Sequence, residues 1–155
     1  MFQRILVPLD GSEHSLRALD IAIQVAKKFE GKITLVHVYS AAVKPVMMPE
    51  AATVPPPMIP IMTPLEVSKI AEAARKAGSG ILMGGAERVK AEGVPVETIL
   101  LEGNTVQEII KAAGEGKFDL IVMGARGISK IREILLGSVS DGVLRNAPCP
   151  VLIVK

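Results

Sequence analysis

The amino-acid sequence predicts an α/β fold: an open parallel sheet of five strands with helices on both faces. Five short runs of apolar and β-branched residues alternate along the chain with segments of helical periodicity, the pattern of such a sheet. Apolar residues make up 49% of the chain and aromatic residues only 3%, so the core is aliphatic, as is typical of a buried parallel sheet. The 155 residues fit one domain, because domains usually contain about 100 to 200 residues.

The first three expected elements are a strand, a helix and a strand. Residues 4–9 (RILVPL) form a short apolar run that ends at the turn residues 10–12 (DGS). Residues 13–30 repeat apolar side chains at spacings of three and four, which predicts a helix with Ser12 as N-cap and Gly31 as C′ residue. Residues 32–39 (KITLVHVY) then predict a β-branched strand.

A proline- and methionine-rich insert follows at about residues 43–64 of the single domain that we expect over residues 1–155. It holds seven of the eleven prolines and four of the seven methionines. Proline removes N–H donors and restricts the preceding residue, so the insert is predicted to be a long surface loop. Its methionines suit contacts with a partner or across a pocket mouth, but a loosely ordered insert is the simpler interpretation.

The second half of the chain continues the alternation. Thr63, Pro64 and Glu66 form a capping-box helix start, and the helix should extend to about residue 91. Glycines inside this helix disfavour helical structure, so a break of the helix near Gly78 is an alternative to a continuous helix. The remaining expected elements are a strand at 94–101, a helix from Asn104, a strand at 119–123, a helix at 138–146 and a strand at 151–154.

Candidate binding residues follow the strands, because open parallel sheets bind ligands at the carboxyl ends of their strands, where the strand order reverses. Residues 8–12, 37–40 and 124–127 occupy such positions. Gly124 and Gly127 leave backbone N–H groups accessible, which suits a loop that wraps a phosphate.

The start of the helix at 138–146 offers a second device for binding anions. Gly137 and Ser138 begin a helix whose free N–H groups and positive dipole end attract anions. Ser138 and Ser140 offer hydroxyls to phosphate oxygens or to a bound cation, and Arg126 and Lys130 supply positive charge. A purely structural interpretation also exists, because a loop with glycine turns and a serine N-cap needs no ligand.

The spacing of these residues is more specific than the residues themselves. Gly124, two residues, Gly127, nine residues, Gly137 and Ser138 give the signature G-x-x-G-(nine)-G-[S/T]. The signature resembles that of the ATP-binding branch of the universal stress protein family. RILVPLDGSEHSLRALDIAIQVAKKFEGKITLVHV, FDLIVMGARG and LLGSVSDGVLRNAPCPVLIVK extend the resemblance over almost the whole chain.

The resemblance implies a fold like that of the adenine nucleotide alpha hydrolases, with strand order 3-2-1-4-5. It also implies ATP, or else ADP or AMP, bound between the first and fourth strands. We further expect Mg2+ to be held through the phosphates, with Ser138 as a candidate additional ligand. A homodimer through the last strand, residues 151–154, and an unidentified regulatory protein partner are further expectations.

The resemblance assigns individual positions of this chain to the nucleotide site. Pro8 and Asp10 match positions beside the adenine and ribose, Val38 meets the adenine edge through its backbone, and Met123 and Gly124 border the ribose. The phosphate-binding positions match Gly127, Gly137, Ser138, Val139 and Ser140.

Simpler roles remain open for several of these residues and for both histidines. Asp10 can form an Asx-turn that caps the following helix, and Val38 and Met123 can be core residues. We expect His37 to be a packed core or rim residue, and His14 to lie in a solvated first helical turn.

Several other classes of protein are disfavoured. The chain has no G-x-x-x-x-G-K-[ST] loop, no H-E-x-x-H zinc motif, and no S-G-G-x-D-S pyrophosphate loop like that of related hydrolases, so we expect at most slow ATP hydrolysis. A receiver domain would need an acidic pair after the first strand, where only Asp10 is present. The alternative function is a nucleotide-independent dimeric interaction module of the same fold.

Charge and cysteine content indicate the cellular setting. The net charge is +2 with both signs interleaved, which gives no footprint for nucleic acid or a membrane surface. Cys149 has no partner for an internal disulfide, and no secretory leader or membrane-spanning run is recognisable, so we expect a cytoplasmic protein.

Overall fold

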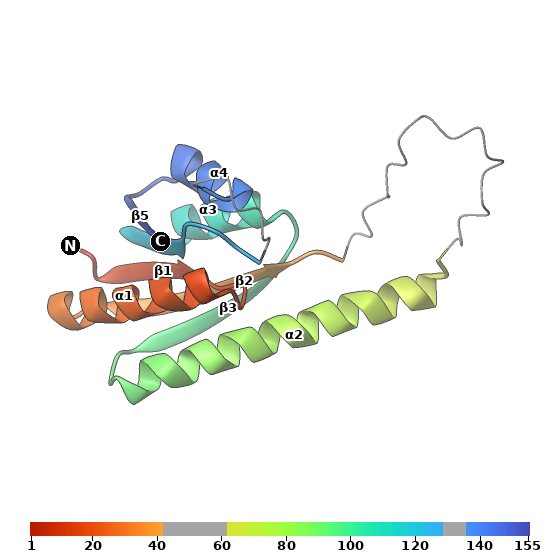
Figure 1. Ribbon diagram of the computed structural model, residues 1–155, viewed down its shortest axis with the longest axis horizontal. Helices are drawn as coiled ribbons and strands as arrows, with labels where there is room; N and C mark the ends of the chain where they lie inside the picture. The colour runs from red at the N-terminus through yellow and green to blue at the C-terminus, as the bar shows by residue number, and fades with distance from the viewer. Residues whose placement is uncertain (42–61, 129–135) are drawn as a thin grey trace.

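The computed structural model describes residues 1–41, 62–128 and 136–155 and contains a five-stranded sheet (Figure 1). Its strands are parallel and lie in the order β3-β2-β1-β4-β5. They are β1 (Arg4–Pro8), β2 (Lys32–Tyr39), β3 (Val96–Glu102), β4 (Leu120–Gly124) and β5 (Val151–Val154). The predicted fold class and strand order are therefore confirmed. The described residues do not include most of the expected loop insert, residues 43–61. They also do not include Lys130, which the sequence suggested as a source of positive charge.

Four helices cover the two faces of the sheet (Figure 1). They are α1 (Glu13–Phe29), α2 (Pro64–Ala91), α3 (Thr105–Glu115) and α4 (Ser138–Asn146). The helices α1 and α2 pack on one face, and α3 and α4 pack on the other. No helix in the described part of the chain is both long and apolar enough to cross a membrane.

Two aliphatic cores lie on opposite faces of the sheet, and β1 contributes to both. Ile5 and Val7 belong to the core under α1 and α2, whereas Leu6 belongs to the core under α3 and α4. Successive side chains of a strand point to opposite faces, so a continuous apolar run is buried on both sides. This explains why the strand sequences are uniformly apolar rather than alternating.

The helix α2 is continuous through Gly78, where the sequence left a break open. A Cβ added at Gly78 would lie 2.5 Å from His37 Cδ2, and one added at Gly85 would lie 2.6 Å from Leu9 Cδ1. Both glycines therefore allow the helix to approach the sheet closely. Gly80 and Gly84 have no heavy atom within 4 Å of an added Cβ.

Some predicted element ends differ from those in the structure. The third strand begins at Val96 rather than at residue 94, because the Val94 N–H donates to Val89 O (3.4 Å) and closes the end of α2. Ser12 caps α1 as predicted, since its Oγ accepts the Ser15 N–H. The left-handed residue after α1 is Glu30 (φ 53°) and not Gly31. Gly31 instead allows a close approach of the backbone, because a Cβ added at this position would lie 2.6 Å from Phe2 O.

Candidate functional site

A cavity of about 340 Å3 lies at the carboxyl ends of β1, β2 and β4. The structure brings together all eleven residues that the sequence proposed for the site. They are Pro8, Asp10, Val38, Met123, Gly124, Arg126, Gly127, Gly137, Ser138, Val139 and Ser140. These residues come from three strand ends and from α4, which are far apart in the sequence. The cavity lies where the order of the parallel sheet reverses, between β1 and β4.

Asp10 uses its two carboxylate oxygens differently. Oδ1 accepts the Ser12 N–H at 2.9 Å, which confirms the Asx-turn before α1. Oδ2 faces Gly127, because a Cβ added at Gly127 would lie 2.6 Å from it. The Asx-turn therefore fixes the carboxylate next to the glycine stretch while one oxygen still borders the cavity. Contact with a ribose remains a prediction.

Gly124 has a structural reason to be glycine. A Cβ at this position would lie 2.7 Å from the backbone carbon of His14 and 2.9 Å from its oxygen. The first turn of α1 thus packs directly on the end of β4. His14 is half-buried rather than solvated as expected, and its Nδ1 is buried without a hydrogen-bond partner among the described residues.

Ser140 holds together the two described ends of the loop between β4 and α4. Its hydroxyl lies 2.7 Å from Ala125 O and 2.9 Å from Gly137 O, and only 2% of the residue is exposed. Ala125 O also accepts the Gly137 N–H at 2.7 Å. The Ser140 hydroxyl hydrogen is thus engaged within the protein, and any contact with a ligand would use a remaining lone pair. The sequence missed this positioning role.

The helix α4 has the predicted bounds, residues 138–146. Its N-cap is Gly137 (φ −72°, ψ 162°) without a side-chain capping bond, so the serine N-cap of the purely structural interpretation does not form. Ser138 is instead the first helical residue and lines the cavity. The first turn of a helix leaves N–H groups without intrahelical partners, and these give the cavity a wall that favours anions.

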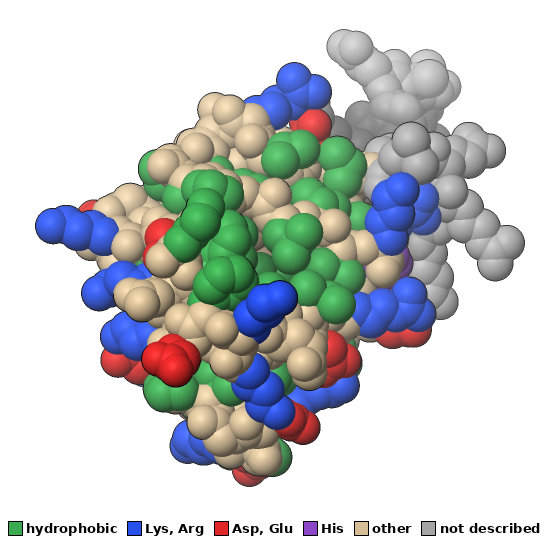
Figure 2. Space-filling model, turned by 90° about the vertical axis from the view of Figure 1, so that its left-hand side faces the viewer, with side chains coloured by type: hydrophobic (Ala, Val, Ile, Leu, Met, Phe, Trp, Pro, Cys, Tyr) green, Lys and Arg blue, Asp and Glu red, His purple; other side chains and the backbone are tan. Residues whose placement is uncertain are grey.

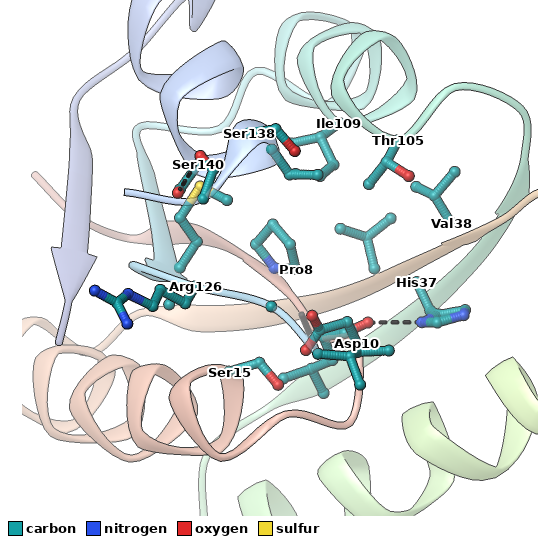
Figure 3. A pocket seen from close by; sticks show the side chains of 18 residues that line it. Pro8, Asp10, Ser15, His37, Val38, Thr105, Ile109, Arg126, Ser138 and Ser140 are labelled. Atoms are coloured by element: carbon teal, nitrogen blue, oxygen red, sulfur yellow. Dashed lines mark hydrogen bonds between the residues drawn. The ribbon is translucent and has the colours of Figure 1, made fainter. Parts of the chain in front are cut away.

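Arg126 lines the cavity but extends its guanidinium away from the centre. Figure 3 shows this side chain pointing in the opposite direction from Asp10. The neighbouring Ala125 N–H donates to Val154 O of β5 at 2.7 Å. The segment after β4 therefore connects the cavity with the last strand of the sheet.

Seven lining residues were not proposed as site residues. They are Leu9, Ser15, Val36, His37, Thr105, Ile109 and Ile128. Thr105 and Ile109 lie one turn apart at the start of α3, on the wall opposite Asp10 in Figure 3. Their spacing of four was visible in the sequence, but which face of α3 meets the cavity depends on how the helix packs.

His37 behaves as the packed rim residue that the sequence predicted. Its Nδ1 lies 2.7 Å from Leu9 O (Figure 3), so Nδ1 carries the hydrogen and donates it to the carbonyl. Its Cδ2 packs against Gly78 of α2. These contacts fix the imidazole ring between β2 and α2.

The cavity walls contain few groups that could hold a metal ion by themselves. Within the described residues, no cluster of three or more His, Cys, Asp or Glu side chains is arranged around a common point. Among the described lining residues, Asp10 is the one carboxylate. A divalent cation at this site would therefore need oxygen ligands from a bound molecule.

Comparisons with known proteins identify relatives along the full chain. Universal stress protein YxiE of Bacillus subtilis is 36% identical over 155 residues, which is 100% of both chains. A universal stress protein crystallised with cAMP is 32% identical, with a TM-score of 0.68 over 99% of this chain and 97% of the other. UspA from Lactobacillus plantarum shares the fold at 21% identity, with a TM-score of 0.81 over 99% and 98% of the two chains. The sequence model of the universal stress protein family matches residues 1–155. The chain belongs to the universal stress protein family.

Proposed function

We propose that the cavity binds an adenine nucleotide, ATP or else ADP or AMP, and that the protein belongs to the ATP-binding branch of its family. The observation that carries this proposal is that Asp10, Val38 and the residues of the G-x-x-G-(nine)-G-[S/T] signature line one cavity. A relative at 32% identity was crystallised with cAMP, another adenine nucleotide.

The cavity lining offers groups for each part of a nucleotide. Val38, Ile109 and Met123 provide apolar surface for a base, and the free oxygen of Asp10 can accept a hydrogen bond from a ribose hydroxyl. Gly127 and the first turn of α4 provide backbone N–H groups for phosphates.

Mg2+ would enter this site together with the phosphates. The donor set fits this arrangement, because Mg2+ is commonly held by phosphate oxygens and water with only one or two protein ligands. Ser138 lines the cavity at the start of α4 and could add its hydroxyl. The cation would neutralise phosphate charge.

A binding role fits the side chains better than efficient catalysis does. Asp10 and His37 are the titratable groups in the described lining that resemble a general base. Among the described residues, neither is hydrogen-bonded to a hydroxyl or thiol that could act as a nucleophile, since Asp10 accepts the Ser12 N–H and His37 lies against Leu9 O. We therefore propose a nucleotide-responsive regulatory protein with slow ATP hydrolysis at most.

Calorimetric titration tests the proposal. Nucleotide-free protein is titrated with MgATP, MgADP and AMP, and thermal unfolding is followed at the same concentrations. Binding at one site per chain, with a rise in unfolding temperature, is expected. Absence of both heat and a thermal shift at millimolar nucleotide would overturn the proposal. Mass spectrometry of molecules released by denaturing freshly purified protein identifies any nucleotide that copurifies.

The alternative function is a nucleotide-independent interaction module of the same fold. Two contacts favour it: Gly124 is needed for packing on His14, and the Ser140 hydroxyl is engaged with Ala125 and Gly137. These parts of the signature have a structural reason without any ligand. A substitution at Gly127 distinguishes the two proposed functions. A Cβ added there would meet the Asp10 carboxylate at the cavity wall and no other part of the described protein within 4 Å, apart from the chain neighbours of Gly127.

Both functions are proposed to operate in a homodimer formed through β5. This strand is an end strand of the sheet, and Leu152 at its middle is 38% exposed. Figure 2 looks at the end of the molecule where β5 and both termini lie, and hydrophobic side chains gather near the middle of this face. Pairing two copies of β5 would cover an exposed edge and bury apolar surface.

A further inference from the structure

A second hollow lies between α2 and β3, the end strand at the opposite edge of the sheet from β5. This α2/β3 groove has a volume of about 730 Å3 and shares no lining residue with the nucleotide cavity. Figure 1 shows α2 running alongside β3. Five residues of each element line the groove, namely Ser79, Leu82, Met83, Ala86 and Lys90 of α2, and residues 96–100 of β3.

The outer edge of β3 presents backbone groups that no strand of the described sheet pairs with. Ile33 N–H donates to Pro95 O (2.9 Å), and Gly103 N–H donates to Tyr39 O (3.0 Å), so the odd-numbered residues direct their backbone groups toward β2. Alternate residues of a strand direct these groups to opposite sides. The N–H and C=O groups of Val96, Thr98 and Leu100 therefore point outward. An extended chain satisfies such a row of donors and acceptors.

Six of the ten residues that line the groove are apolar. Leu82 and Ala86 are buried, Val96 and Leu100 are half-buried, and Met83 leaves 63% of its surface exposed. A strand added to β3 would point every second side chain toward α2 and into the groove. Apolar side chains at alternate positions would cover Met83.

A positively charged side chain, that of Lys90, lies at one end of the groove. Lys90 lines it, and among the described residues no ion-pair partner is found for this lysine. The neighbouring Glu97 lies 3.4 Å from Lys32 and is already paired. A carboxylate at this end of a bound chain would complement Lys90.

We propose that the α2/β3 groove binds an extended peptide segment of a partner protein, which joins the sheet as a strand beside β3. The segment carries apolar residues at every second position and a carboxylate beside Lys90. Backbone pairing gives affinity in this mode, and the alternating side chains give specificity. This site does not depend on the nucleotide cavity.

Two synthetic probe peptides test the proposal with the full chain. They are acetyl-ETVTVTVTK-amide and acetyl-KTVTVTVTE-amide, in which the glutamate shares the face of the valines and lies at opposite ends, because strand direction is not fixed by the groove. The control peptide acetyl-ETTVVVTTK-amide has the composition of the first but lacks alternation. Fluorescence anisotropy of labelled peptides should show saturable binding of at least one alternating probe and much weaker binding of the control.

Variants locate the binding. Thr98→Pro removes an outward N–H and keeps the β2–β3 ladder, because proline is tolerated on the free side of an end strand. It should weaken probe binding about tenfold or more, as should Met83→Glu. Lys90→Gln should weaken it severalfold and reduce its salt dependence. Ile70→Glu is the matched control, since Ile70 is exposed on α2 outside the groove.

Three outcomes would overturn the proposed peptide binding. No binding of either alternating probe would overturn it, as would binding that Thr98→Pro and Met83→Glu leave unchanged. If these two variants instead abolish self-association in sedimentation experiments without peptide, a second copy of this chain occupies the groove and the peptide assignment is wrong. Met83→Glu changes an exposed side chain, so its fold should survive even if Thr98→Pro destabilises the strand.

Discussion

At the residue scale, the glycines of the signature differ in what they make room for. Gly124 accommodates the backbone of His14, whereas an added Cβ at Gly127 would meet the Asp10 carboxylate at 2.6 Å. Gly137 has ordinary spacing, with the nearest atom to its added Cβ at 3.5 Å. A single sequence signature therefore combines a packing requirement at Gly124 with a cavity requirement at Gly127.

The substitution Gly127→Val should lower nucleotide affinity at least about tenfold while the fold survives. The new side chain would displace the Asp10 carboxylate and occupy the side of the cavity where phosphates are proposed to bind. Calorimetric titration with MgATP measures the affinity, and thermal unfolding measures stability. Gly84→Val, on the open surface of α2, is the control. Unchanged affinity in Gly127→Val would mean that the site is wrongly located.

The substitution Ser140→Ala should lower the free energy of unfolding by about 1 to 2 kcal/mol. It removes the hydroxyl that lies near both Ala125 O and Gly137 O in a position that is 2% exposed. Urea unfolding measures the change, with Ser79→Ala as a control at an exposed serine of α2. Equal stability of the two variants would contradict the structural role of Ser140.

At the element scale, α2 combines glycines of two kinds. Replacing Gly80 or Gly84 by alanine should raise the free energy of unfolding by up to about 1 kcal/mol, because alanine favours the helix and has room there. Replacing Gly78 or Gly85 should lower it by about 1 to 3 kcal/mol, because the Cβ would overlap with His37 or Leu9. Chemical denaturation of the four single variants checks the signs. A uniform effect would show that close packing does not distinguish them.

The start of α2 should respond to pH through Glu66. The backbone N–H of Thr63 donates to the Glu66 carboxylate (2.7 Å), and this bond, followed by that of the Thr63 hydroxyl, lowers the pKa of Glu66. A lowered folded-state pKa contributes stability above the unfolded-state pKa, and this contribution is lost as pH falls through the folded-state pKa. The stability difference between wild type and Glu66→Gln should therefore shrink on acidification. Urea unfolding of both proteins over the acidic range measures it, and a constant difference would contradict the coupling.

At the scale of the whole molecule, the two outer edges of the sheet have different surroundings. The edge at β5 is short and lies near both termini, whereas the longer edge at β3 runs beside the α2/β3 groove. We propose that the first edge pairs copies of this chain and the second receives another chain. The two assignments can be tested independently because the edges lie at opposite ends of the strand order.

The substitution Leu152→Glu should convert the proposed dimer into monomers by placing a charge at the middle of β5. Sedimentation velocity should show a dimer for the wild type and a loss of at least about tenfold in dimer affinity for the variant. Leu65→Glu, at an exposed position of α2, should leave the dimer intact. A wild-type monomer at all accessible concentrations would refute the proposed assembly.

The sequence by itself determined the order and approximate extent of the elements, because strand and helix periodicity and caps such as Ser12 and Thr63 are local properties. It also placed residues 8–12, 37–40 and 124–127 at one edge of the sheet, because parallel strands bring their carboxyl ends together, and the family resemblance assigned the eleven residues that line the cavity. Close packing was decided only by the tertiary structure. The contacts of Gly78 with His37 and of Gly124 with His14 join segments far apart in the chain, and no local pattern records the distance between them.

The side-chain roles within the cavity were also decided by the tertiary structure. The Ser140 hydroxyl faces Ala125 O, and the Arg126 guanidinium points away from Asp10, although the sequence suggested both residues as groups that meet phosphates. A local pattern specifies which residues reach an edge of the sheet. The direction of each side chain depends on the hydrogen bonds and the space that neighbouring segments leave for it, and these exist only after folding.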